Sequence, residues 1–151
     1  MKQQIGDNYV DNVSEVSPIE TTYDAVANDS NKSWTVPNGE MWKLNWARML
    51  LVTSADVGNR QSELIVKDEA GNTVFSIKAG AIQGASTTRV YHYSQHVSHE
   101  AAFVVSEIQA PIPSDLYLPA GFTLQLWDSS AIAAAADDMT ISFQVKVYKG
   151  A

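Results

Sequence analysis

Apolar and polar residues alternate along much of the chain from residue 33 onward, and this alternation predicts β-strands. The clearest run covers 139–148, in which every second residue is apolar and the residues between are mostly polar. Its apolar positions are Met139, Ile141, Phe143, Val145 and Val147. A period of two turns one face of a strand toward a core, whereas no long stretch shows the helical period. We therefore expect an all-β protein.

Turn residues separate the other segments with strand character. The segments cover 33–36, 41–53, 63–67, 73–78, 87–94, 101–108, 116–118 and 122–127. Pro37-Asn38-Gly39 and Pro119-Ala120-Gly121 join a fixed proline φ to a permissive glycine, and 68–72 is equally rich in turn residues. About eight or nine short strands at such spacings are typical of antiparallel sandwiches. We predict an antiparallel β-sandwich, jelly-roll-like, with an extended N-terminal arm.

The longest predicted strand, 41–53, carries two tryptophans. Its even positions would face the core, which places Trp42 and Trp46 between the sheets. Arg48 is the exception on that face, and a bulge or an exit at the sheet edge is expected there.

Residues 1–31 read as an acidic arm in front of a body that covers 32–151. They contain one lysine against six acidic residues, which accounts for −5 of the net charge of −7. Their apolar residues are isolated and follow neither the helical nor the strand period. The arm therefore packs on its own domain as an edge strand, or it lies on a neighbouring subunit or another protein. In the second case, deleting 1–28 would weaken binding to a partner without unfolding the body.

Composition and charge exclude several classes of protein. The chain of 151 residues contains no cysteine, which excludes disulfides, thiolate zinc sites and a cysteine nucleophile. A pI near 4.7 argues against nucleic-acid binding, which needs a basic surface. No apolar run is long enough for a membrane helix, and the first residues lack the apolar stretch of a signal peptide.

The three histidines are candidate metal ligands, but their spacing is unfavourable. His92, His96 and His99 do not form the His-x-His pair of metal-binding jelly rolls. On an extended strand His92 and His96 would lie about 13 Å apart, at ~3.3 Å per residue. We expect ordinary surface or turn histidines and no metal.

Three aspartates flank the alanine-rich stretch 131–136. Asp128, Asp137 and Asp138 could gather around calcium, yet they lack a regular ligand spacing. A helix cap at Asp128 and a solvated acidic turn at 137–138 are the expected arrangement. The chain also lacks a nucleophile elbow and a phosphate loop, so we expect no cofactor and no enzymatic activity.

Aromatic residues predicted to point outward are candidates for a partner interface, because such side chains are common in protein interfaces. Coverage by the arm or by the second sheet is the alternative explanation for them. Together with apolar residues of the arm, the candidates are Ile5, Tyr9, Val10, Val13, Tyr23, Tyr91, Tyr93, Trp127 and Tyr148.

Four stretches of the body give a resemblance to a known class of protein. They are WTVPNGEMWKL (34–44), VKDEAGNTV (66–74), APIPSDLYLPAGFTL (110–124) and WDSSAIAAAADDM (127–139). In these turn-and-strand phrases the chain resembles capsid decoration, or cement, proteins of tailed bacteriophages, which have a jelly-roll fold. The resemblance covers roughly 33–149 and leaves out the arm.

The resemblance implies a non-enzymatic virion protein on the outer capsid surface, made in the cytoplasm of a bacterial host. Its partners would be the major capsid protein and further copies of itself, as a homodimer or homotrimer, with no nucleic acid and no membrane. Two alternatives stay open. One is another virion part, such as a tail, neck or head-fibre component. The other is a carbohydrate- or receptor-binding β-sandwich that uses Trp127 and the tyrosines.

Overall fold

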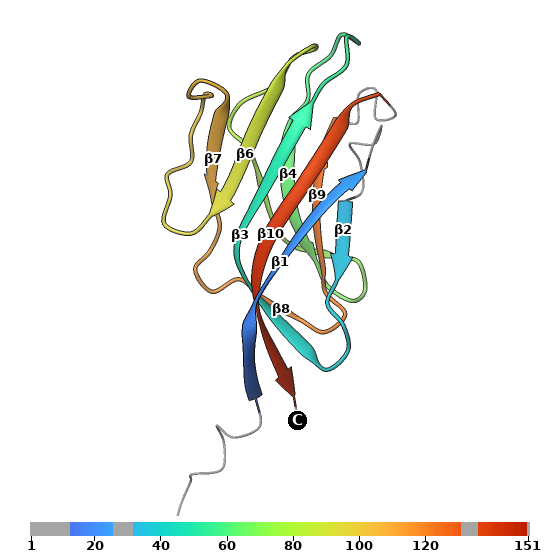
Figure 1. The fold of residues 1–151 in the computed structure, drawn as a ribbon, viewed down its shortest axis with the longest axis vertical. Coiled ribbons are helices and arrows are strands. Elements are labelled where there is room, and N and C mark those ends of the chain that lie inside the picture. Colours follow the sequence, from blue (N-terminus) through green and yellow to red (C-terminus); the bar gives the residue numbers. More distant parts are fainter. Residues whose placement is uncertain (1–12, 26–31, 131–135, 151) are drawn as a thin grey trace, which may run out of the picture.

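The computed structural model describes residues 13–25, 32–130 and 136–150, which form strands joined by turns and loops (Figure 1). The strands are β1 (Val13–Ala25), β2 (Lys32–Thr35), β3 (Glu40–Val52), β4 (Ser62–Lys67), β5 (Thr73–Lys78), β6 (Thr88–Ser94), β7 (Glu107–Pro111), β8 (Tyr117–Pro119), β9 (Thr123–Asp128) and β10 (Asp138–Gly150). The described part of the chain contains no helix. The all-β prediction is therefore confirmed.

Two sheets pack face to face. The larger has the order β1-β10-β3-β6-β7, with β8 paired to β3, and the smaller has the order β2-β9-β4-β5. The layers β1-β10-β3-β6 and β2-β9-β4-β5 make up the eight-stranded pattern of a jelly roll, with β7 and β8 added. This confirms the predicted jelly-roll-like sandwich. One pair departs from the prediction, because β6 and β7 run parallel and need the long crossover 95–106 between them.

The core fills the space between the two sheets. Phe143 of β10 lies near its centre, with its ring centroid 4.9 Å from that of Trp34 and 6.0 Å from that of Trp42. The five apolar positions predicted for 139–147 are all fully buried, which confirms that the alternation of this run marks an inward face.

A bulge in β3 reverses the predicted facing of half of that strand. Gln144 pairs with Trp46 but Val145 pairs with Leu44, so Asn45 is an extra residue in β3. Beyond it the inward positions become odd-numbered, beginning with Ala47, and Trp46 and Arg48 move to the outer face. The expectation that Trp46 anchors the core is therefore wrong, whereas Trp42 is buried as predicted.

Strand β1 lies at the edge of the larger sheet, antiparallel to β10 (Figure 1). Its register shifts between Val16 and Ile19, the stretch that contains Pro18. A proline has no N–H for a ladder and is tolerated at an edge or a bulge. In the single chain, residues 13–25 thus supply the first strand of the jelly roll. The division into an arm, 1–31, and a body, 32–151, stays a prediction.

The stretch 101–108 is not the continuous strand that its composition predicts. Val104 and Glu107 close a tight turn through two backbone hydrogen bonds of 2.8 and 3.1 Å, and β7 begins only at Glu107. The turn interrupts the strand because Val105 has a φ of 60°.

Candidate functional site

Of the five predicted interface residues near the N-terminus, the structure places only two. Ile5, Tyr9 and Val10 lie outside the described residues. Val13 and Tyr23 belong to β1, where they stand opposite Gly150 and Ile141 of β10.

Tyr91 and Tyr93 are core residues, so their predicted exposure is wrong. Both are fully buried because β6 turns them inward, toward the smaller sheet. The Tyr91 hydroxyl donates to Oε1 of Gln83 at 2.8 Å, and the Tyr93 hydroxyl lies 2.7 Å from Oγ of Ser62. Burial raises the pKa of both phenols, so both stay neutral. Neither side chain is available to a partner.

Trp127 and Tyr148 lie on different sheets. The Trp127 indole donates to Oε2 of Glu63 at 3.3 Å on the smaller sheet. Tyr148 of the larger sheet neighbours Tyr117, with ring centroids 6.3 Å apart. The aromatic residues predicted from the sequence therefore do not converge on one surface.

The histidines are also dispersed. Nε2 of His92 lies 3.4 Å from Oε2 of Glu107, whereas Nε2 of His99 lies 2.9 Å from the carbonyl oxygen of Lys78. His96 occupies a turn with a φ of 61°. Within the described residues no group of three or more possible ligands is close enough to hold a metal.

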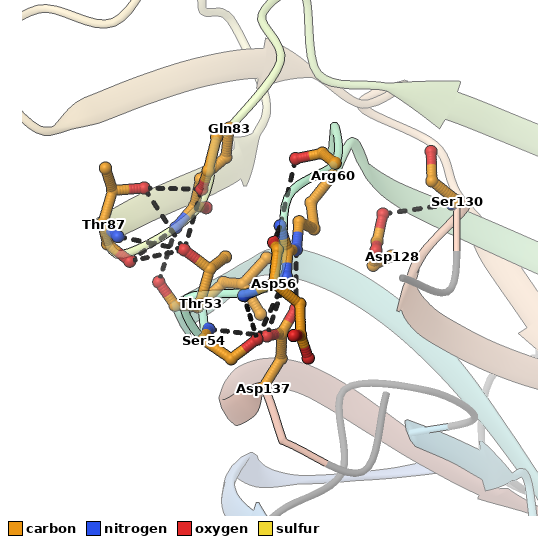
Figure 2. Close-up of polar contacts among 12 residues, drawn as sticks. Thr53, Ser54, Asp56, Arg60, Gln83, Thr87, Asp128, Ser130 and Asp137 are labelled. Carbon is orange, nitrogen blue, oxygen red and sulfur yellow. Dashed lines mark hydrogen bonds and ion pairs between the residues drawn. The ribbon is translucent and has the colours of Figure 1, made fainter. Parts of the chain in front are cut away.

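Asp137 takes part in a buried ion pair that the sequence reading missed. Its Oδ2 accepts from Nε of Arg60 at 2.7 Å and its Oδ1 from Nη2 at 3.1 Å, and both side chains are fully buried (Figure 2). Burial opposes the charged carboxylate, but hydrogen bonds from Arg60 and Ser54 outweigh it and hold the pKa of Asp137 below its ordinary value. The predicted solvated turn at Asp137 is therefore wrong.

Asp128 is buried as well. Its Oδ1 accepts from the backbone N–H of Gln61 at 2.8 Å and of Ser130 at 3.1 Å. It thus joins the end of β9 to the start of β4. The helical turn predicted for 131–136 lies mostly outside the described residues.

Arg60 organises the loop 53–61. Its Nη1 donates to the carbonyl oxygens of Asp56 and Gly58 at 2.8 and 3.0 Å, and its Nη2 donates to Oγ of Ser54 at 3.2 Å. A guanidinium is planar and offers donors in fixed directions. Arg60 therefore holds this loop in one conformation from within.

A second loop, 79–87, is bonded to the first. The backbones of Arg60 and Gln83 exchange two hydrogen bonds of 2.8 Å, and the N–H of Ser86 donates to the carbonyl oxygen of Ser54. Thr53 adds a bond from its hydroxyl to the carbonyl oxygen of Gly84 (2.8 Å). Figure 2 shows Thr53, Gln83 and Thr87 side by side with the Arg60 cluster.

The turn 103–106 lies at the same end of the sandwich. Nη1 of Arg89 donates to the carbonyl oxygen of Val105 at 3.2 Å, and the guanidinium lies 4.9 Å from the ring centroid of Phe103. Figure 1 shows this turn and the two loops together at the upper end of the molecule. We call the segments 53–61, 79–87 and 103–106 the loop end.

Four exposed apolar side chains belong to the loop end. Val57 is 95% exposed, Val105 91%, Val104 64% and Ile82 54%. Val105 is also in the left-handed region, which is unusual for a β-branched residue and costs about 1–3 kcal/mol. Because these apolar side chains stand on well-bonded loops, the loop end is a candidate surface for interaction with another protein. In the sequence, the only sign of this surface was the pair Val104 and Val105, and their stretch is equally typical of a β-strand.

Two grooves lie on the outer faces of the sheets. One, of about 410 Å³, lies beside the turn 68–71 on the smaller sheet and is lined by polar residues such as Thr35, Thr123 and Gln125. The other, of about 540 Å³, lies on the larger sheet, and its lining includes Trp46, Arg48 and His92. No helix in the described part of the chain is long and apolar enough to cross a membrane.

The fold and these surfaces define a jelly-roll protein whose loop end carries exposed apolar side chains. No protein-family model and no curated protein matches the chain. Among solved structures, it is similar to that of the Gx strain of infectious bursal disease virus, at 13% identity over 90% of this chain and 33% of that chain, with a TM-score of 0.31. A T=1 particle derived from the same virus gives 12% identity over 89% of this chain and 39% of that chain, with a TM-score of 0.32.

The chain spans about a third to two fifths of the length of these viral chains. The "T13 IBDV viral particle" structure gives similar figures, with 13% identity, 38% of that chain and a TM-score of 0.31. The assignment of the jelly roll rests on the strand order and hydrogen-bonded register of this chain itself.

Proposed function

We propose that the chain is a non-enzymatic structural protein of a virus particle, a decoration protein that binds the outer surface of an assembled bacteriophage head. Its partners would be the major capsid protein and further copies of itself. The resemblance of the four turn-and-strand phrases supports this role. So does the jelly-roll strand order, since that fold recurs in viral capsid domains. The fold alone does not define a function, so the proposal rests on the surface that would contact the capsid.

The observation that carries the proposal is the set of exposed valines on the loop end. Val57 and Val105 are almost fully exposed, although their loops are held by buried or bonded arginines. Rigid loops lose little conformational entropy when they bind. Most of the free energy gained from a small apolar contact therefore contributes to affinity. We assign the loop end as the surface that meets the capsid.

Binding to an assembled shell would explain how such a small contact suffices. A ligand that binds only the assembled lattice stabilises that lattice by mass action. When copies also contact each other, the second contact becomes intramolecular and the overall avidity rises.

The test is binding of the purified chain to expanded, undecorated heads, measured by co-sedimentation, beside binding to unassembled capsid subunits. The double variant Val57→Asp/Val105→Asp should lower binding to heads at least about tenfold, because each aspartate would bury an unpaired charge in an apolar contact. Val74→Asp is the matched control, since Val74 is 53% exposed but belongs to β5, away from the loop end. Equal binding to heads and to free subunits, or equal loss in both variants, would contradict the proposal.

Two other functions give different results. A tail, neck or head-fibre component would occur in a few copies per particle, whereas a decoration protein occurs in large numbers, and quantitative gel staining of particles separates the two. A carbohydrate-binding module that uses Trp127 would bind glycans, lose that binding in Trp127→Ala and show no binding to heads.

A further inference from the structure

The groove of about 540 Å³ on the outer face of the larger sheet contains none of the loop-end valines in its lining. It lies over β6, between β3 and β7, and Trp46, Arg48, His92, Val97, Glu107 and Gln109 are among its lining residues. Its volume lies in the usual range for small-ligand pockets, about 300–1,000 Å³. We propose that it binds a saccharide that carries a carboxylate, such as a sialic or uronic acid.

The strand register arranges the side chains of the groove in rows. Arg48, His92 and Gln109 stand opposite one another on β3, β6 and β7, and Trp46 stands opposite Ser94 in the next row. Rows on one face of a sheet are about 7 Å apart. Trp46 and Arg48 thus stand in neighbouring rows along β3, and both line the groove.

Arg48 has no partner among the described residues, unlike the other two arginines of the chain. Arg60 is bonded to Asp137, and Arg89 is bonded to Val105 and stacked on Phe103. Arg48 is half-buried and lines the groove, and among the described residues no carboxylate forms an ion pair with it. Guanidinium groups bind planar carboxylates through two parallel hydrogen bonds, which makes an acidic ligand the natural complement.

The Trp46 indole is also unbonded. The indole N–H groups of Trp42 and Trp127 donate to Glu40 and Glu63, whereas that of Trp46 has no acceptor among the described residues. The bulge at Asn45 keeps Trp46 out of the core and turns it toward the groove. Bulges commonly redirect side chains next to binding sites. An aromatic surface with free hydrogen-bonding groups beside it suits a ring that has an apolar face and hydroxyl edges.

The backbone around the groove excludes peptide binding by strand addition. β3 is paired on both sides by β10 and β6, and β6 is paired by β3 and β7. Their N–H and C=O groups are therefore used within the sheet, and a ligand must be recognised by side chains. Gln109 and Ser94 offer polar groups for hydroxyls, and the His92–Glu107 pair offers a donor and an acceptor.

The test uses the purified full chain, 3′-sialyllactose and a glucuronic-acid disaccharide as acidic probes, and lactose as the neutral probe. Binding is followed by isothermal titration and by NMR shifts of the indole N–H signals. At least one acidic probe should bind at least about tenfold more tightly than lactose, because charge-assisted bonds to Arg48 are lost with the neutral sugar. The Trp46 indole signal should shift while that of Trp42 does not.

Variants locate the site. Arg48→Gln should reduce affinity for the acidic probe about tenfold or more and leave the weak lactose affinity unchanged, and Trp46→Ala should weaken both. Arg89→Gln and Trp127→Phe are matched controls outside the groove and should bind as the parent does. Thermal melting of each variant verifies folding. No binding of either acidic probe at millimolar concentration, equal affinity for lactose, or equal loss in the controls would overturn the inference. These binding measurements contain no phage heads. A negative result would therefore overturn the saccharide site without bearing on the proposed decoration role, which the co-sedimentation experiment tests.

Discussion

The Arg60 guanidinium and the Asp137 carboxylate meet at 2.7 Å, and neither side chain has any exposed surface. The pair joins two segments that lie far apart in the chain, the loop after β3 and the residue before β10. Water is excluded, so each charge depends on the other and on its hydrogen bonds to Ser54, Asp56 and Gly58.

Replacing Asp137 by Asn should destabilise the fold strongly. The substitution removes the carboxylate that pairs with the buried Arg60 guanidinium, and breaking a buried ion pair typically costs about 3–5 kcal/mol. Urea unfolding followed by tryptophan fluorescence measures this loss. Asp115→Asn is the control, because Asp115 is exposed and lies 3.7 Å from Nζ of Lys43. A pair of this kind is worth about 0–1 kcal/mol, so a similar loss in both variants would contradict the buried-pair account.

The same pair predicts how stability depends on pH. The pKa of Asp137 in the folded state lies below its ordinary value of 3.8, so the unfolded chain takes up the proton first as pH falls. The stabilisation is complete above about pH 4–5 and is lost as pH falls through the folded-state pKa. Urea midpoints at pH 7, 5 and 3 should show a smaller acid-induced loss in Asp137→Asn than in the parent. Parallel curves would contradict this assignment.

The strands were predictable because local pattern determines them. The alternation through Phe143 and the turn at Asn38-Gly39 both depend on residues close in sequence, and the structure has the strand and the turn there. The strands on either side of that turn, β2 and β3, belong to different sheets and do not form a hairpin. The sequence predicted the fold class, a jelly-roll-like sandwich, but not the strand order within each sheet. That order depends on contacts between segments that are distant in the chain.

The missed features have non-local causes. The bulge at Asn45 depends on how β3 matches β10, and it alone decides that Trp46 faces outward. The burial of Arg60 depends on Asp137, 77 residues later in the chain. Val105 reads as a strand residue, but the Arg89 side chain and the bonds between Val104 and Glu107 hold it in a tight turn.

Gly80→Ala should destabilise the crossover that leads to β7. A Cβ at this position would collide with the backbone carbonyl oxygen of Glu100, which has little freedom to move. Overpacking of this kind costs about 1–3 kcal/mol. Gly84→Ala is the control in the same loop, because nothing lies within 4 Å of its added Cβ. Chemical denaturation of both variants makes the comparison, and equal stability would show that the close approach does not matter.

Val105→Asn should raise stability and lower binding to heads. Asparagine tolerates the φ of 60° at this position better than a β-branched residue, so the free energy of unfolding should rise by up to about 1 kcal/mol. The same change removes an exposed apolar tip from the loop end. Denaturation and co-sedimentation measure the two effects. If stability rose with unchanged binding, Val105 would have no role in docking.

Truncations separate the roles of the N-terminal segments. Deleting 1–28 removes all of β1 and leaves the thirteen-residue strand β10 as an unprotected edge of the larger sheet. A long open edge promotes pairing with other chains, so we expect lower stability and concentration-dependent aggregation. This result differs from the expectation for a separate arm, in which the body stays intact.

Deleting only 1–12 retains every described strand and is the matched control. It should unfold at the urea concentration of the full chain, and light scattering should show no aggregation. Adding a synthetic peptide of 13–25 to the 1–28 deletion should restore the lost stability, because the edge of β10 accepts an antiparallel strand of this sequence. A 1–28 deletion that remained soluble and as stable as the full chain would show that β1 contributes nothing to the sandwich.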